Sequence, residues 1–145
     1  MKSKQFKLRA FDSKKYFTVI VYDKLKDLRD AANGYSKLTG SIKDYGNTLG
    51  VCHPFERIKI KGKKPIKLNE IGMIRLSKKH TTTHIVFHET MHAAFWQYRL
   101  SLSKKYKENA DFGDSNSDKE ENFLHLAGKI YTKMIRQMYK HKYWK

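Results

Sequence analysis

A chain of 145 residues can bury one hydrophobic core but not two, so we expect a single domain over residues 1–145. The single cysteine, Cys52, excludes an internal disulfide bond, and we expect it to be a small core residue in a reducing compartment. The net charge of +17 is consistent with partners that carry phosphate groups. No apolar run approaches the roughly 20 residues of a membrane-spanning helix or suffices for a signal-peptide core, so we expect a cytoplasmic protein.

The first elements expected along the chain are a strand and a helix. Residues 14–23, KKYFTVIVYD, have the β-branched and aromatic composition of a strand. Residues 23–37 repeat leucine and alanine at helical spacing behind Asp23, a candidate N-cap. Residues 38–50 contain three glycines and are expected to form a loop.

Two further strands and two helices are expected after this loop. Residues 57–61 alternate as in a half-buried strand, the tripeptide at 63–65 turns the chain, and residues 69–79 form the next strand. A histidine-rich helix follows, then a polar connector at 101–118 and a last helix over about 118–140. The apolar stripe of the last helix consists of Phe123, Ala127, Ile130, Met134 and Met138. Together these elements predict an α+β fold, with a small twisted sheet packed against the histidine-rich and C-terminal helices.

The histidine-rich helix carries the strongest chemical signal. His80, His84, His88 and His92 recur every four residues, and the last two enclose Glu89 in a His-Glu-x-x-His pattern. Imidazoles at i and i+4 present their nitrogens to one Zn²⁺, and the carboxylate between them points to the side where a zinc-bound water would sit. The pattern therefore predicts His88 and His92 as zinc ligands and Glu89 as the general base.

The residues around the motif predict where its helix begins and how far it is buried. The threonines at 81–83 suit an N-cap. The neighbouring apolar residues, including Ile85, Phe87 and Phe95, predict a largely buried helix. Histidines without a ligand would be costly in such a helix, which favours metal binding.

A hydrolytic zinc site needs a third protein ligand, and the segment SDKEENFLHLAG offers two glutamates at the start of the last helix. Ser117 and Glu120 form a capping box, which occupies Glu120 and leaves Glu121 for the metal. Glu121 also has His125 one turn on, where its ring can hydrogen-bond to the ligands, and Gly128 beyond, which permits a close helix approach. We therefore expect Glu121 as the third ligand, with Glu120 as the second choice.

The segments GMIRLS, HIVFHETMHAAF and EENFLHLAG, which span about 71–130, resemble the gluzincin metallopeptidases. The chain looks like the small single-domain members that phages and mobile elements often encode, in which case the cytoplasm is that of the host. The resemblance implies a minimal zincin-like fold, Zn²⁺ as the cofactor and a protein or peptide substrate. It assigns the zinc ligands to His88, His92 and Glu121, and the general base to Glu89.

Two features of the resemblance leave alternatives open. Members often carry an acidic residue or asparagine four residues after the ligand glutamate, where this chain has His125. His125 is therefore another candidate for the third ligand, as in SprT-like proteases, whose third ligand is histidine. Residues 71–77 correspond to an edge strand that pairs with an extended substrate in zincin-like domains, and the alternative is a strand in the sheet interior.

The other histidines have weaker assignments. His84 either lines the cleft, contacting a ligand or stabilising a transition state, or is exposed at the helix start; Tyr98 is a second candidate for the stabilising role. His80 is expected at the surface. His53 and His141 are expected to be structural or exposed.

Positive charge is unevenly distributed along the chain. Residues 1–79 carry a net +13, residues 80–125 carry −2 and the remainder carries +6, so the candidate site is not basic. Lysine supplies 25 of the 31 basic residues, which favours nonspecific contacts with phosphates over base reading. A lysine-rich face that only maintains solubility is the simplest interpretation of this charge.

Two functions therefore follow from the sequence. The first is a zinc-dependent peptide hydrolase in which Glu89 activates a zinc-bound water. The alternative is a basic protein that binds nucleic acid or a protein partner and keeps a structural or vestigial zinc site.

Overall fold

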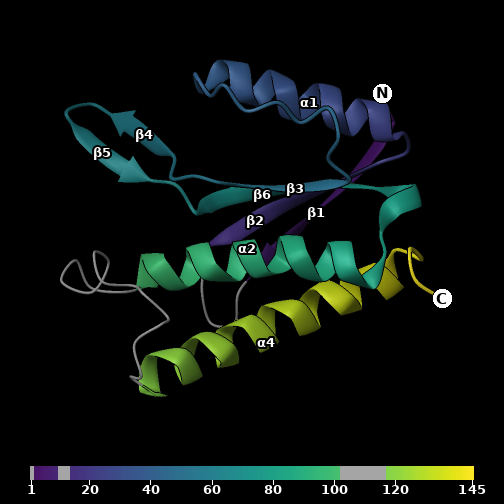
Figure 1. The fold of residues 1–145 in the computed structure, drawn as a ribbon. Helices are drawn as coiled ribbons and strands as arrows, with labels where there is room; N and C mark the ends of the chain where they lie inside the picture. Colours follow the sequence, from purple (N-terminus) through teal and green to yellow (C-terminus); the bar gives the residue numbers. More distant parts are fainter. Residues whose placement is uncertain (1, 10–13, 102–116) are drawn as a thin grey trace.

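A four-stranded sheet separates the helices into two layers in the computed structural model, which describes residues 2–9, 14–101 and 117–145 (Figure 1). The strands are β1 (Ser3–Arg9), β2 (Tyr16–Tyr22), β3 (Gly50–Pro54), β4 (Ile58–Lys61), β5 (Lys64–Lys67) and β6 (Glu70–Ser77). The helices are α1 (Leu25–Leu38), α2 (Thr83–Ser101) and α4 (Ser117–Lys140), with a 3₁₀ turn at Lys78–His80. The fold belongs to the α+β class, as the sequence predicted.

The order of strands in the sheet is β1-β2-β6-β3. β2 and β6 are parallel, whereas β1 and β3 pair antiparallel with their neighbours. β6 therefore lies inside the sheet, and its residues cannot offer a free edge to a substrate. Among the described residues no strand pairs with the outer side of β3, so β3 is the edge strand next to α2.

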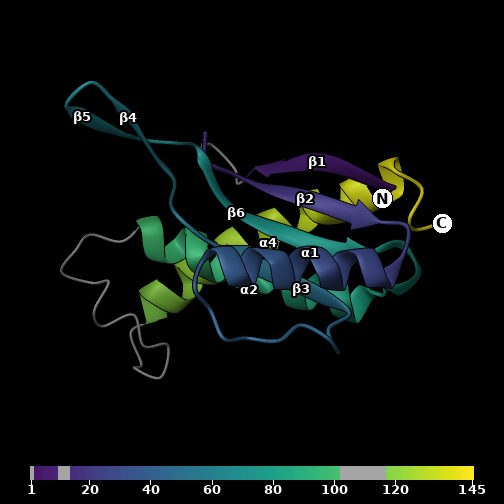
Figure 2. The same cartoon turned by 90° about the horizontal axis from the view of Figure 1, so that it is seen from above.

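The two faces of the sheet are covered differently. α1 covers one face, and α2 and α4 run antiparallel to each other across the other face (Figures 1 and 2). Alternate residues of β2 and β6 point toward α2 and α4 and form most of the core. Fully buried members of this core include Phe17, Val19, Val21, Ile74, Leu76, Val86, Ala93, Ala94, Ile130, Met134 and Met138.

The N-cap of α2 agrees with the prediction from the sequence, whereas the N-cap of α1 does not. The Oγ1 of Thr82 accepts a hydrogen bond from the N–H of Ile85 at 3.3 Å, so an N-cap within the threonine run is confirmed. For α1 the expected cap at Asp23 is wrong, because Lys24 holds the N-cap position and makes no side-chain capping bond. α4 begins at Ser117, within one residue of the prediction.

Three strands were not expected from the sequence. β1 precedes the first predicted strand, β3 lies in a segment without strict alternation, and β5 occupies the place of the predicted turn. The predicted strand at 57–61 exists as β4, but every residue of it is exposed, because it pairs only with β5 outside the main sheet. The expected connector at 101–118 lies mostly outside the described residues.

Within the described ranges, no helix has both the length and the apolar character needed to cross a membrane.

Candidate metal centre

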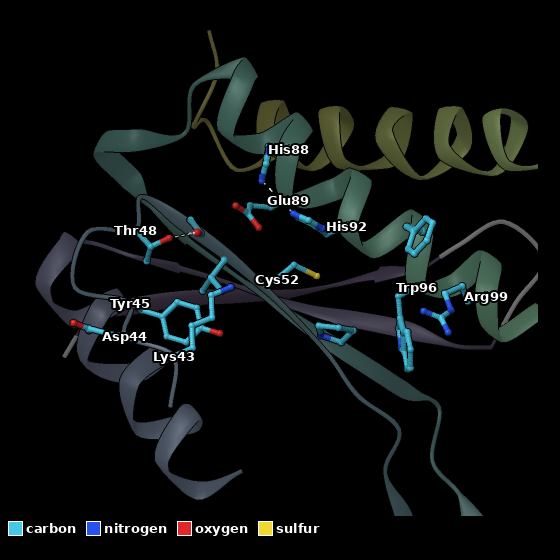
Figure 3. Close-up of a pocket in the computed structure, with 14 residues that line it drawn as sticks. Lys43, Asp44, Tyr45, Thr48, Cys52, His88, Glu89, His92, Trp96 and Arg99 are labelled. Carbon is cyan, nitrogen blue, oxygen red and sulfur yellow. Dashed lines mark hydrogen bonds between the residues drawn. The ribbon is translucent and has the colours of Figure 1, made fainter. Parts of the chain in front are cut away.

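His88 and His92 lie on the side of α2 that faces the sheet edge at β3 (Figure 3). Their Nε2 atoms are 3.1 Å apart, and the ring planes are inclined by 77°. Two nitrogens bound to one tetrahedral zinc at about 2.0–2.1 Å would stand roughly 3.3 Å from each other. The spacing between the rings therefore fits two ligands of a shared ion.

The histidines of α2 are less buried than the sequence predicted. His84, His88 and His92 are all exposed, because the buried side of α2 is formed by other residues, including Val86 and Ala93. The prediction of a buried histidine row is thus wrong. Partial burial nevertheless lowers the pKa of His92, and the neighbouring His88 and Lys43 lower it further.

Glu89 lies between the histidine pair and β3, and only 7% of its surface is exposed (Figure 3). Burial raises the pKa of its carboxyl group to about 7, although a hydrogen bond from the Cys52 backbone and the charge of Lys43 act in the opposite direction. A carboxyl group with this pKa can both accept and release a proton near neutral pH.

A glycine in β3 allows Glu89 to reach this position. A Cβ atom at Gly50 would lie 2.9 Å from Cγ2 of Ile85 and 3.1 Å from Cγ of Glu89. The strand and the helix therefore approach each other more closely than a larger residue would permit. Thr48 secures the start of the strand, because its hydroxyl donates a hydrogen bond to the Gly50 carbonyl (Figure 3).

A groove of about 540 Å³ runs between α2 and β3, with the histidine pair and Glu89 along it. The loop before β3 contributes Lys43, Asp44 and Tyr45 to one wall. The C-terminal half of α2 contributes Phe95, Trp96 and Arg99, which continue the groove beyond His92 (Figure 3). No pattern in the sequence indicated these residues, because the loop and the helix meet only through the packing of β3 against α2.

The predicted third ligands lie elsewhere. Glu120, Glu121 and His125 are exposed on α4, and none of them lines the groove. Over the described ranges, no three histidine, cysteine, aspartate or glutamate side chains come close enough to share a metal ion. The structure thus brings His88, His92 and Glu89 together, and it does not bring Glu121 to them.

The remaining candidates take different places. His84 stands beside His88, with 6.3 Å between ring centres, whereas Tyr98 is buried against Phe123 of α4 and away from the groove. His53 is buried beneath α1, where its ring contacts Tyr35 at 4.3 Å, so its structural role is confirmed.

Two further expectations concern Cys52 and His141. Cys52 packs against the core, and burial raises the pKa of its thiol, with Glu89 adding to the effect, as expected for a residue that is not a nucleophile. His141 stacks on Phe6 of β1 with ring centres 4.9 Å apart, which is also a structural contact.

No match to the chain was found among protein-family models, curated proteins or solved structures.

Proposed function

We propose that the protein is a zinc-dependent peptide hydrolase, with His88 and His92 as metal ligands and Glu89 as the general base. One observation carries the proposal: two convergent imidazole nitrogens, 3.1 Å apart, stand beside a buried carboxyl group whose pKa is raised to about 7. Exposed histidines at helical spacing are common, but a buried glutamate beside them is costly unless it has a task.

His88 and His92 would hold the zinc ion, which would supply a Lewis acid for the scissile carbonyl group and for water. Glu89 provides the proton transfers. Its carboxylate takes a proton from the attacking water and delivers it to the nitrogen of the departing amine. A hydrogen bond from the Cys52 backbone holds this carboxyl group beside the histidine pair, where it can act on a proton without first reorienting.

The substrate in this proposal is an extended peptide that lies along β3. This strand has an outer edge without a strand partner among the described residues, and it forms one wall of the groove. A peptide added there would use backbone hydrogen bonds, which suit many sequences. Lys43 beside the motif and Arg99 farther along α2 also line the groove. Outside the motif these two cations outnumber the one carboxylate, Asp44, which favours acidic side chains in the substrate.

Glu121 stays the predicted third ligand, with Glu120 and His125 as alternatives, although the structure brings none of the three to the histidine pair. All three are exposed on α4 in the structure. Zinc content of the variants Glu121→Gln, Glu120→Gln and His125→Ala, measured by atomic emission on purified protein, will identify the residue. Only the variant that lacks the third ligand should lose zinc.

The first experiment tests the histidine pair. We expect His88→Ala and His92→Ala to bind zinc at least about tenfold more weakly than the parent protein, measured by competition with a chromophoric chelator. His84→Ala is the matched control, since it lies one turn earlier on the same helix and is also exposed. Absence of zinc binding in the parent protein, or equal loss in all three variants, would overturn the site.

The second experiment tests the base. Glu89→Gln should keep zinc and lose peptide hydrolysis by on the order of 10²-fold or more, measured by mass spectrometry on a mixed peptide library. Glu56→Gln is the control, because this exposed glutamate does not line the groove, and it should retain full activity. Activity in Glu89→Gln equal to that of the parent would contradict the proposed mechanism.

A further inference from the structure

The β4–β5 hairpin, here called the ribbon (residues 57–67), projects from the end of the main sheet (Figures 1 and 2). Its two-residue turn places Gly62 first, with a φ of 65°, as a type II′ hairpin requires. Every residue from 56 to 69 is exposed, and the two strands pair with each other only, among the described residues. A two-stranded hairpin that packs on nothing is marginally stable alone, so the fold itself does not account for the ribbon.

The ribbon concentrates positive charge. It has six basic residues and no acidic residue. Two of these cations are paired at its base, Arg57 with Glu70 at 3.8 Å and Lys67 with Glu56 at 3.4 Å. The other four have no ion pair in the part of the chain that the structure describes: Lys59, Lys61, Lys63 and Lys64.

The strand register sorts the side chains onto two faces. Lys61 lies opposite Lys64, and Lys59 lies opposite Ile66, so three lysines share one face. Ile58 and Ile60 are on the other face and remain 56% and 75% exposed. The lysine face is therefore a row of charges on a narrow, extended support.

The positive charge continues onto the body of the protein. Lys7 and Arg9 of β1, together with Lys14, line a hollow of about 520 Å³ at the base of the ribbon. Tyr16, Leu68, Asn69 and Glu70 complete its lining, so three cations face one carboxylate there. The charged row thus has a concave extension that a long polyanion can follow.

Three features select the polyanion. The major groove of a duplex admits a two-stranded ribbon, which matches the shape of this element. Residues 57–67 contain no aromatic side chain on which the bases of a single strand could stack. All free cations of the ribbon are lysines, which contact phosphates as point charges and do not read base edges in the way that arginine does.

We infer that the ribbon is a binding element for duplex nucleic acid, independent of base sequence, with Lys59, Lys61 and Lys64 in contact with backbone phosphates. The inference does not rest on the hydrolase, because no ribbon residue lines the groove at β3. It assigns a role to a segment whose lysines and isoleucines have no task in the fold.

The test compares two triple variants with the same net charge. One replaces Lys59, Lys61 and Lys64 by glutamate. The control replaces Lys24, Lys78 and Lys79 by glutamate. These three lysines are exposed, and they lie at the other end of the sheet because they follow the ends of β2 and β6. Binding to a labelled DNA duplex of roughly 20 base pairs, about two helical turns, is measured by fluorescence anisotropy over a range of salt concentrations.

We expect the ribbon variant to bind the duplex on the order of tenfold or more weakly, with the salt slope reduced by about 0.9 for each lost phosphate contact. The control should change by less than about threefold, and circular dichroism should show both variants folded. Equal losses in the two variants would overturn the inference, since only total charge would then matter.

Two further measurements use the same pair of variants. A single strand of equal length should bind more weakly than the duplex, and the opposite order would contradict insertion of the ribbon into a groove. Vesicles of phosphatidylcholine with phosphatidylserine should bind less tightly than the duplex and without dependence on the ribbon. Ribbon-dependent binding to vesicles in the absence of duplex binding would assign the element to a membrane surface instead.

Discussion

Neighbouring residues of β3 place two ionisable groups in very different surroundings. Cys52 points toward α2, where its backbone donates a hydrogen bond to Glu89, whereas His53 points toward α1 and packs against the Tyr35 ring at an angle of 40°. Burial lowers the pKa of His53 to about 4, and the charges of Arg75 and Lys43 contribute. One face of the strand therefore contacts the carboxyl group of Glu89 on α2, and the other face carries the imidazole of His53.

His53 makes stability depend on pH. Because its pKa is lower in the folded protein than the ordinary value of 6.5, the unfolded chain takes up the proton first as the pH falls. The stability contributed by neutral His53 is complete above pH 6.5 and is lost as the pH approaches 4. Urea unfolding should show that His53→Phe gains about 2–3 kcal/mol relative to the parent between pH 7 and pH 4.5. An equal pH dependence in both proteins would show that His53 accepts a proton without unfolding.

At the scale of elements, the contact between β3 and α2 decides the geometry of the groove. Gly50 sits where the strand crosses the helix, and a methyl group there would press on Ile85 and Glu89 at once. A displacement of α2 would also move His88 and His92, since all these residues share one rigid helix.

Gly50→Ala should therefore destabilise the protein by about 1–3 kcal/mol and weaken zinc binding, measured by urea unfolding and chelator competition. Gly34→Ala is the control in the exposed middle of α1, where nothing lies within 4 Å of the added atom. It should stabilise the protein by about 0.5–1 kcal/mol, because alanine favours the helix. A stable Gly50→Ala variant with unchanged zinc binding would show that β3 and α2 have room to separate.

The face of α4 that meets the core was predictable, and it bears on the third ligand. Phe123, Ile130 and Met134 form the predicted apolar stripe and pack inward. Glu121 lies roughly 160° around the helix from that stripe, on the exposed side. Two local features favoured Glu121, namely the capping box and His125. Both concern α4 alone, so they do not indicate which side of this helix faces α2.

The whole molecule is strongly cationic, with a net charge of +17 over 145 residues. The ion pairs Lys26–Asp30, Arg57–Glu70 and Lys67–Glu56 are all at least partly exposed, so each of them offsets little of the mutual repulsion. Charge of this size opposes the compact state through self-repulsion.

Added salt should therefore stabilise the protein. Raising the ionic strength from about 0.01 M to 0.15 M shortens the screening length from roughly 30 Å to 8 Å. We expect Tm to rise by roughly 2–5 °C in a calorimetric scan, equally with chloride and with glutamate as the anion. A fall in Tm would show that the attractive contacts dominate, and a rise with one anion only would indicate a specific anion site.

The sequence by itself determined the local features of this protein. Helical spacing in α1, α2 and α4 and the β-branched density of β2 and β6 specify those elements, because these signals act between residues close in the chain. The sequence also determined that the rings of His88 and His92 lie close together, because residues four apart on a helix are neighbours on its surface.

Only the tertiary structure decided which strand forms the edge of the sheet and that the strand at 57–61 lies outside the core. It also decided that Glu89 is buried against β3 and that Glu121 is exposed. Each of these depends on how elements distant in sequence pack. Strand order and helix rotation follow from the summed burial of many side chains, which no short pattern contains.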